Sequence, residues 1–337
     1  MQTLILREPH RFELVDTPEP EAIRPGEALV RVHRVGVCGT DLHAYEGRQP
    51  FFRYPRVLGH ELGVEVVSVE PNDRGIRVGD RCAVEPYLNC GSCRACRRGK
   101  TNCCEKLEVL GVHTDGGMRA YLTVPLHKLH RSETLSYEQL ALVEMLCIGA
   151  HAVRRAGVEP GESVLVVGAG PIGLSVAAFA RAAGADVMVM ERSEQRLRFC
   201  REHLGIGNTI LASQDSMSEV KRAGGDLPGA VFDATGNAAS MQGAFDLTAH
   251  GGTLVFVGLV QGDVTFHDPD FHRREMMLLS SRNATGEDFS TVIGGLESGQ
   301  VDVEPWISAT VPLTDAPAAF PTWLDPANGV IKAVLIP

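Results

Sequence analysis

The sequence lacks an excess of positive charge. Its 337 residues contain 32 Lys and Arg against 42 Asp and Glu, which gives a net charge of −10 at pH 7. Nucleic acids and anionic membranes are bound through basic patches. We therefore expect neither nucleic acid nor a membrane as a partner.

Long hydrophobic runs are also missing. The longest apolar stretch, residues 164–190, is interrupted by Gly168, Gly170, Pro171, Gly173 and Arg181. It is too broken for a membrane-spanning helix. The first residues, MQTLILREPHRFELV, have neither the apolar core nor the small-residue cleavage site of a signal peptide. We expect a cytoplasmic protein.

The cysteines do not form the even, spread pattern of a secreted disulfide framework. There are nine, and five of them lie between Cys90 and Cys104. In a reducing compartment such a bunch indicates a metal site. The rest of the composition, 44% hydrophobic and 22% charged, is that of a globular protein. The length corresponds to two domains of roughly 150 residues each.

The pattern of apolar residues predicts two kinds of structure. Residues 28–37 and 63–69 alternate apolar and polar side chains, as half-buried strands do. From Ser163 the pattern changes to short apolar strands that alternate with helices, which predicts a parallel sheet covered on both faces. In this part we expect strands at 163–167, 186–190, 229–233 and 253–257, and helices at 172–183 and 194–204.

The alternation ends after about Arg282. One further helix is expected at 288–299 and a final strand at 331–336. The fold class is therefore α/β. A β-rich domain is formed by both ends of the chain, 1–150 plus 285–337, and a doubly wound parallel-sheet domain, 151–284, is inserted between them.

A glycine-rich turn marks the inserted domain as a dinucleotide-binding Rossmann domain. The motif consists of Gly168, Gly170, Pro171, Ile172 and Gly173. It follows an apolar strand and opens a helix, which is the context that the motif needs. The glycines permit a tight turn, a close approach of the pyrophosphate and tight packing, and the helix N-terminus attracts phosphate. A tight turn without a nucleotide is the alternative.

Glu191 ends the next predicted strand and is placed to bind the ribose hydroxyls of NAD. The adjacent Arg192 weakens this preference, because an arginine can accept the 2′-phosphate of NADP. We include Arg192, Arg196 and Arg282 among the expected cofactor-binding residues.

Two groups of residues are candidates for metal ligands. Cys90, Cys93, Cys96 and Cys104 have the spacing of a closed four-thiolate site, which predicts a structural zinc. Free thiols and an iron–sulfur cluster are the alternatives for this loop, and Cys103 is a second choice for the last ligand. Cys82, Cys147 and Cys200 are expected in the core.

The second group is drawn from distant segments: Cys38, His60, Glu61 and Glu144. A cysteine, a histidine and carboxylates from separate segments suit a catalytic zinc that keeps one coordination position open.

Together these motifs resemble the zinc-containing medium-chain alcohol dehydrogenases over essentially the whole chain. The matching segments are C-G-T-D-L-H at 38–43, G-H-E at 59–61, G-D-R at 79–81, the cysteine loop and the glycine-rich turn. The resemblance implies a GroES-like catalytic domain and an NAD-dependent zinc enzyme, a homodimer or homotetramer. A glutamate at 144 resembles the sorbitol (polyol) dehydrogenase branch, with sugar-acid (hexonate) dehydrogenases as a further possibility.

The resemblance also implies roles for single residues. Cys38 and His60 hold the catalytic zinc, with Glu61 or Glu144 as a further ligand, and Asp41 orients His60. The substrate is a secondary alcohol, a polyol or a sugar acid, whose zinc alkoxide loses hydride to NAD in the cleft between the domains. Thr40 takes up the proton and His43 passes it to water.

The substrate side is less well defined. Tyr45, Arg48, Phe51 and Phe52 are candidates for lining the cleft, or are ordinary surface residues. Threonine and formaldehyde dehydrogenases share the same framework and are alternatives. A non-catalytic zinc- and nucleotide-binding relative is an alternative of another class, although it would not need Thr40 and His43. A zinc-free quinone reductase would lack the cysteine loop and the Cys38/His60 pair.

Overall fold

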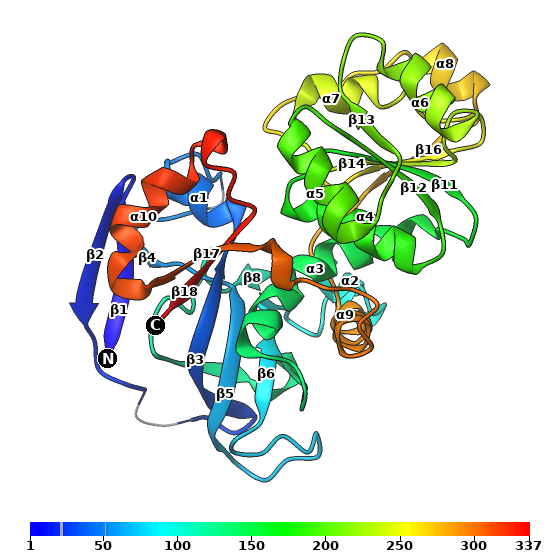
Figure 1. Cartoon of the computed structure of the whole chain (residues 1–337). Coiled ribbons are helices and arrows are strands. Elements are labelled where there is room, and N and C mark those ends of the chain that lie inside the picture. The colour runs from blue at the N-terminus through cyan, green and yellow to red at the C-terminus, as the bar shows by residue number, and fades with distance from the viewer. Residues whose placement is uncertain (21–22, 51) are drawn as a thin grey trace. The chain divides into compact units, whose positions relative to one another are not determined.

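The computed structural model describes residues 1–20, 23–50 and 52–337, which form two compact units. Unit 1 consists of Met1–Glu144, Thr285–Gly299 and Val303–Pro337, and unit 2 of Met145–Ala284 and Gln300–Asp302. Unit 2 is drawn mainly in green and yellow in Figure 1.

Unit 1 is built from β-sheets. Its largest sheet has the strand order β10-β6-β5-β3-β18-β17, with β9 paired to β3, and a smaller sheet has the order β2-β1-β4. The strands are β1 (Gln2–Glu8), β2 (Arg11–Asp16), β3 (Glu27–Val37), β4 (Arg56–Val57), β5 (Glu61–Val69), β6 (Arg81–Val84), β7 (Tyr87–Leu88), β8 (Glu108–Val109), β9 (Tyr121–Pro125), β10 (Leu129–Arg131), β17 (Ile307–Pro312) and β18 (Lys332–Ile336).

The helices of unit 1 are α1 (Gly39–Tyr45), α2 (Arg94–Arg97), α9 (Gly286–Glu297) and α10 (Ala316–Trp323). The C-terminal strand β18 pairs with β3, so both ends of the chain contribute to one sheet, as the sequence predicts. Alternate residues of β3 and β5, such as Val30, Val32, Leu62 and Val64, are buried in the core of the unit.

Unit 2 contains a six-stranded sheet in which neighbouring strands are parallel, with the order β13-β12-β11-β14-β15-β16. Its strands are β11 (Ser163–Val167), β12 (Asp186–Glu191), β13 (Thr209–Leu211), β14 (Ala230–Asp233), β15 (Thr253–Phe256) and β16 (Met277–Ser280). Its helices are α4 (Pro171–Ala182), α5 (Glu194–Leu204), α6 (Ser216–Gly224), α7 (Ala238–Gly243) and α8 (Asp268–Arg273). This order reverses between β11 and β14, which is where a Rossmann sheet binds its nucleotide.

The predicted inserted Rossmann-type domain and β-rich domain are therefore confirmed. The sequence did not predict α3 (Tyr137–Ala156), the helix in which unit 1 ends and unit 2 begins. Its residues 140–147 are all buried, so the helix has little of the one-sided apolar pattern that reveals a surface helix. Strand β16 was not predicted either. Its apolar residues are largely exposed, so its burial differs from that of the other strands of the sheet.

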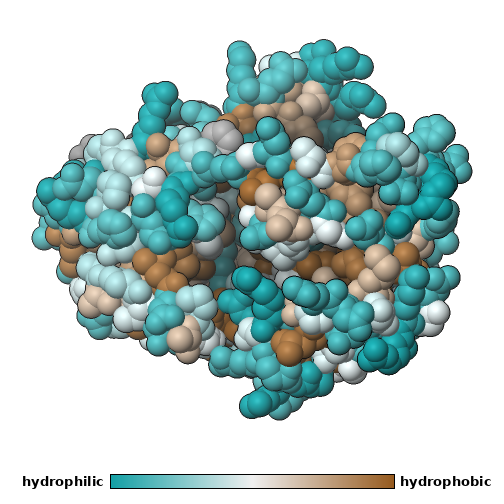
Figure 2. Space-filling view, turned by 90° about the horizontal axis from the view of Figure 1, so that it is seen from above, coloured by the Kyte–Doolittle hydropathy of each residue, from teal (hydrophilic) through white to brown (hydrophobic). Residues whose placement is uncertain are grey.

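Among the described residues no helix is both long and apolar enough to cross a membrane. Figure 2 shows a face on which hydrophilic side chains predominate and hydrophobic residues form smaller separate patches.

Gly149 of α3 tests how tightly this helix packs in unit 2. A Cβ at this position would lie 2.2 Å from Ser175 Oγ and 2.4 Å from the backbone of α4. We expect Gly149→Ala to lower the free energy of unfolding by about 1–3 kcal/mol, because overpacked backbone must move apart. Gly294→Ala in α9 is the matched control, since its Cβ would meet nothing within 4 Å. Urea unfolding of both variants measures the difference, and equal stabilities would contradict the close packing of α3 on α4.

Candidate active site

The register of three strands brings distant residues of unit 1 together. Gly36 of β3 lies opposite Glu61 of β5, and Val37 lies opposite Ala333 of β18. Cys38 follows Val37 directly, and Lys332 precedes Ala333. The end of β3 and the beginnings of β5 and β18 therefore meet at one point of the sheet.

Two glycines make room for this arrangement. A Cβ at Gly36 would lie 2.1 Å from Glu61 Oε2, so only glycine leaves space for the carboxylate. Gly59 has a φ of +92°, a conformation that favours glycine, and it turns the chain just before His60. These constraints explain why the G-H-E segment begins with glycine.

Cys38, His60 and Glu61 form a compact group of possible metal ligands. Their ligand atoms all lie within 4.8 Å of one another. His60 is 5% exposed and Glu61 is fully buried. The fold thus brings together possible metal ligands from segments that lie more than 20 positions apart in the sequence.

Asp41 lies behind His60, at the start of α1. Its Oδ2 accepts a hydrogen bond of 2.9 Å from the backbone N–H of Cys38, and its Oδ1 lies 3.8 Å from His60 Nδ1. Asp41 Oδ1 and His60 Nδ1 are both buried and have no hydrogen-bond partner within the described residues. Burial opposes the charged form of His60, but the negative groups Asp41, Cys38 and Glu144 raise its pKa well above the usual value.

Glu144 lies near His60 but outside the compact group. Its carboxylate accepts a hydrogen bond from the Tyr87 hydroxyl, and both residues are buried. Burial raises the pKa of Glu144, and the neighbouring Glu61 adds to this effect. Tyr87 was not predicted, because a tyrosine in a short strand carries no sequence signal of its own.

Lys332 is a further residue of this site that was not predicted from the sequence. Its Nζ lies 2.6 Å from Oε1 and 2.5 Å from Oε2 of Glu61, and the lysine is only 2% exposed. A buried carboxylate needs such a partner, because an unpaired buried charge is strongly unfavourable. A single lysine within the otherwise apolar run IKAVLI was the signal that could have revealed it.

The donor set fits a zinc ion. One thiol, one imidazole and a choice of carboxylates are the ligands of catalytic zinc sites. Asp41, Glu61, Glu144 and the thiolate form of Cys38 carry more negative charge than Lys332 and a protonated His60 together can balance, so a divalent cation suits the site. Asp41 Oδ1 lies beside His60 and has no hydrogen-bond partner among the residues that the structure describes, which fits a carboxylate that orients a metal-bound imidazole.

Thr40 and His43 lie three residues apart on α1, so both project from one side of the helix that Cys38 precedes. His43 is exposed, whereas Thr40 is partly buried. Desolvation of the His43 ring by neighbouring atoms and the positive charge of Arg48 lower the pKa of His43.

The expected substrate-lining residues have different positions. The prediction for Tyr45 is wrong: it is 5% exposed and stacks on Phe12 in the core. Arg48 is exposed and forms an ion pair with Glu46. Phe52 packs against the core, and Phe51 lies outside the described residues.

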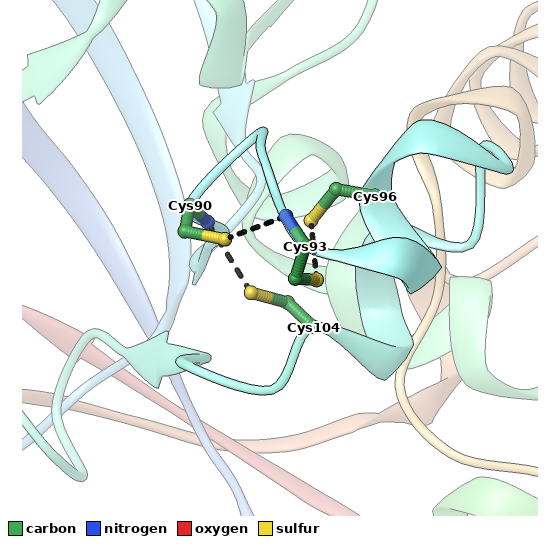
Figure 3. Close-up of side chains that lie close together, drawn as sticks. All are labelled: Cys90, Cys93, Cys96 and Cys104. Carbon is green, nitrogen blue, oxygen red and sulfur yellow. Dashed lines mark hydrogen bonds between the residues drawn. The ribbon is translucent and has the colours of Figure 1, made fainter.

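The cysteine loop forms the second group of possible ligands. The sulfur atoms of Cys90, Cys93, Cys96 and Cys104 lie within 4.8 Å of one another and point toward a common centre (Figure 3). Cys103 is exposed and is not a member of this group, in agreement with the spacing argument. Hydrogen bonds from Ser92 and Cys93 lower the pKa of Cys90 to about 6, which favours the thiolate that a metal binds. The predicted core cysteines Cys82, Cys147 and Cys200 are buried.

In unit 2 the glycine-rich turn has the predicted geometry. Gly168 has a φ of +95°, and a Cβ at Gly173 would lie 1.8 Å from the carbonyl oxygen of Gly168. Gly170 precedes α4, and Pro171 is the first residue of this helix, with Ile172 next. The turn lies at the carboxyl end of β11, beside Thr235 after β14, and therefore at the reversal of strand order.

Glu191 lies next to this turn. Its Oε2 accepts a hydrogen bond of 2.7 Å from the backbone N–H of Ala169, and its Oε1 accepts one from the backbone N–H of Arg192. Arg196 Nη1 lies 4.0 Å from Glu191 Oε2. Glu191 and Arg196 thus both lie beside the glycine-rich turn. Arg282 is exposed and follows β16, at the same edge of the parallel sheet.

A Rossmann sheet, a GroES-like β unit and two groups of zinc-type ligands define a zinc-dependent nicotinamide oxidoreductase. Comparison with known families agrees: the family described as "Alcohol dehydrogenase GroES-like domain" matches residues 24–134, and "Zinc-binding dehydrogenase" matches residues 171–298. "Pyridine nucleotide-disulphide oxidoreductase" also matches residues 130–206, which include the glycine-rich turn.

Individual relatives cover almost the whole chain. L-galactonate-5-dehydrogenase of Escherichia coli is 42% identical over 99% of this chain and 98% of its own. L-arabinitol 4-dehydrogenase of Hypocrea jecorina is 32% identical, covering 93% of this chain and 86% of its own. An alcohol dehydrogenase of Escherichia coli CFT073, solved with NADH, is 29% identical with a TM-score of 0.93 over 100% of this chain and 99% of its own.

The chain belongs to the zinc-type medium-chain alcohol dehydrogenase family. It is an oxidoreductase of the alcohol, polyol and sugar-acid dehydrogenase class, and its cofactors are zinc and a nicotinamide dinucleotide. The predicted family, fold and enzyme class are thereby confirmed.

The two ligand groups predict different responses to mutation. We expect Cys38→Ser to abolish turnover and to retain NADH binding, because the nucleotide turn is in the other unit. We expect Cys93→Ser mainly to lower the melting temperature, because a metal ion bound by four thiolates stabilises a loop that has few buried residues. Zinc content, NADH titration and calorimetry distinguish the two variants. Turnover by Cys38→Ser would refute the catalytic site, and loss of activity in Cys93→Ser at an unchanged melting temperature would refute the structural one.

The position of Glu191 predicts the coenzyme preference. An acidic residue there accepts hydrogen bonds from the ribose and repels a 2′-phosphate. Glu191→Ala should therefore lower the ratio of kcat/KM for NAD to kcat/KM for NADP. Glu194→Ala on α5 is the control. An unchanged ratio would mean that another residue reads the ribose.

Proposed function

We propose that the enzyme transfers a hydride between NAD and a secondary alcohol of a sugar acid, most directly a hexonate. The observation that carries this proposal is the 42% identity with L-galactonate-5-dehydrogenase over nearly the full length of both chains. A second relative, 2-dehydro-3-deoxy-L-galactonate 5-dehydrogenase of Pseudoalteromonas atlantica, is 33% identical over 90% of each chain and also acts on a sugar acid.

Cys38 and His60 hold the catalytic zinc in this proposal, together with Glu61 or Glu144. Zinc supplies a Lewis acid that makes the bound hydroxyl group more acidic. Asp41 holds the imidazole of His60 in its orientation, and Lys332 offsets the charge of Glu61 so that this carboxylate can remain in a buried site. Tyr87 positions Glu144 through its hydroxyl.

Thr40 receives the proton of the substrate hydroxyl, and His43 passes it to solvent. The exposure of His43 supports this role, since a proton relay must end in water. Its lowered pKa keeps the imidazole neutral at neutral pH and able to accept a proton.

For the nucleotide, Gly168, Gly170, Pro171, Ile172 and Gly173 receive the pyrophosphate, and Glu191 reads the ribose. Arg192, Arg196 and Arg282 are the cationic groups that we assign to the rim of this site. A related dehydrogenase of Sinorhizobium meliloti, 28% identical, was solved with NADP, so coenzyme choice varies among relatives. Glu191 favours NAD for this chain.

We also propose that the enzyme is a homo-oligomer assembled through unit 2. Strand β16 ends the sheet order and exposes Met277 to 53% and Leu278 to 37%. An edge strand with exposed apolar side chains is a pairing surface. Sedimentation equilibrium distinguishes a dimer or tetramer from the monomer that would refute this proposal. We further propose a cytoplasmic location, because cysteines clustered as possible metal ligands are typical of proteins in a reducing compartment.

A substrate pair tests the proposed function most sharply. L-galactonate and galactitol differ in a carboxylate in place of a hydroxymethyl group. If the enzyme recognises a sugar acid, kcat/KM for L-galactonate should exceed kcat/KM for galactitol by about 10–100-fold. This factor corresponds to the free energy of one charge-assisted hydrogen bond to the carboxylate. NADH absorbance measures both reactions, with Cys38→Ser as the inactive control. Equal values would reject the sugar acid, and a preference for galactitol would favour a polyol dehydrogenase.

A further inference from the structure

A buried ion pair lies beside the cysteine loop and takes no part in the proposed reaction. Glu85 follows β6, and Lys128 ends the short helix η2 (Leu126–Lys128). Lys128 Nζ donates to Glu85 Oε1, and the two side chains are only 3% and 4% exposed, respectively. The backbone N–H of Glu85 also donates to the carbonyl of Lys128 at 2.8 Å. The pair is thus fixed in both main chain and side chain.

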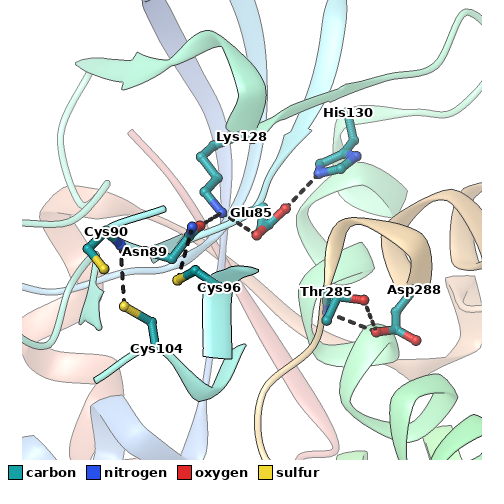
Figure 4. Close-up of polar contacts among 9 residues, drawn as sticks. All are labelled: Glu85, Asn89, Cys90, Cys96, Cys104, Lys128, His130, Thr285 and Asp288. Carbon is teal, nitrogen blue, oxygen red and sulfur yellow. Dashed lines mark hydrogen bonds and ion pairs between the residues drawn. The ribbon is translucent and has the colours of Figure 1, made fainter. Parts of the chain in front are cut away.

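Glu85 is bound on its other side by His130. His130 Nε2 lies 3.1 Å from Glu85 Oε2, and the imidazole stacks on Phe289 of α9 at 4.6 Å. Burial opposes ionisation of Glu85, but His130 and Lys128 together lower its pKa, so the carboxylate is charged at neutral pH. The α9 turn that contains Thr285 and Asp288 lies near this side of the group (Figure 4).

Lys128 uses a further hydrogen bond to reach the metal loop. Its Nζ donates to Asn89 Oδ1 at 2.8 Å, and Asn89 Nδ2 points at Cys96 Sγ, 3.8 Å away (Figure 4). A continuous row therefore runs from His130 through Glu85, Lys128 and Asn89 to Cys96. Because Lys128 occupies the amide oxygen, the orientation of the Asn89 side chain is fixed with its N–H group toward sulfur.

The loop needs such support. Helix α2, which carries Cys96, has no buried residue, so hydrophobic packing does little to hold it. Four thiolates around one divalent ion carry a net charge of −2, and N–H donors reduce the charge on sulfur. Cys90 and Cys104 accept hydrogen bonds from backbone N–H groups, whereas Asn89 is a side-chain donor that mutation can remove.

We propose that Asn89 is a positioning residue for the metal of the cysteine loop, and that Lys128 holds its amide toward Cys96 and thereby slows metal loss. This inference rests on the proposed role of the loop as a metal site. This role of Lys128 also explains why a buried ion pair is present here. Two well-packed apolar side chains would give a similar stability, but they would offer no hydrogen-bond donor to Asn89.

The variant that tests this inference is Asn89→Asp. It keeps an oxygen for Lys128 and replaces the N–H donor beside Cys96 by a second oxygen. The measurement uses the full chain with Cys38→Ser, so that the cysteine loop holds the one remaining ion, and follows metal release to a chromogenic chelator. We expect release about 10–100-fold faster than in the parent, the usual effect of losing a hydrogen bond to a metal ligand. In the cobalt form, the thiolate-to-cobalt absorption band should move to lower energy.

Asn72→Asp is the matched control. Asn72 is also in unit 1, and its Nδ2 likewise donates hydrogen bonds, but to the carbonyl oxygens of Glu70 and Ile76 and not to a cysteine sulfur. It should weaken its own turn and leave both metal release and the cobalt band unchanged. A merely structural role of Asn89 would affect stability in the same way as Asn72→Asp without moving the band.

The role of Lys128 is tested by the double variant Glu85→Met with Lys128→Met. Removing both partners avoids an unpaired buried charge, so the fold should persist, while Asn89 loses its anchor. Faster metal release in this variant supports the proposal, and release at the parental rate overturns the part assigned to Lys128. If Asn89→Asp also releases metal at the parental rate, the inference fails. If the parent protein holds no metal in the loop at all, the proposed structural site itself is wrong.

Discussion

The site depends on the balance of charge around the buried carboxylate of Glu61. The carboxylate is fully buried and lies directly against Gly36, where any side chain would collide with it. Lys332 supplies one positive charge from the last strand of the chain. Removing one partner of a buried pair typically costs about 3–5 kcal/mol, so the first strands and the last strand must be assembled together. The charges that remain on Cys38, Asp41 and Glu144 are those that a divalent ion would neutralise.

The same constraint explains the order of elements along the chain. The end of β3 provides Cys38, the start of β5 provides Glu61, and β18, some 270 residues later, provides Lys332 through a 2.6 Å hydrogen bond. Along the chain, the nucleotide-binding unit lies between strands of this sheet, and β18 follows it and pairs with β3. The metal chemistry and the nucleotide chemistry are therefore built on separate units, each with its own core.

Local patterns in the sequence predicted a large part of this structure. The glycine-rich turn, α5 and β11 were predicted at their observed positions, because strand, turn and helix signals follow one another within a few residues. The two groups of possible metal ligands were predicted from the sequence because cysteine and histidine carry chemistry that few other roles require. Lys332, Tyr87 and Asn89 were not found, since their roles arise only from contacts that form when distant segments fold together. Helix α3 was missed because it is buried on most of its surface, and Tyr45 was misassigned because its position in the sequence does not reveal that it faces the core.

The central claim is that Cys38 and His60 bind one zinc ion at the point where β3, β5 and β18 meet. Anomalous diffraction at the zinc edge, from crystals of the enzyme, tests this most directly. The account predicts a single peak about 2.3 Å from Cys38 Sγ and about 2.1 Å from a ring nitrogen of His60, in addition to the peak within the cysteine loop. A map with no peak between Cys38 and His60, or with the two residues bound to different ions, would contradict it.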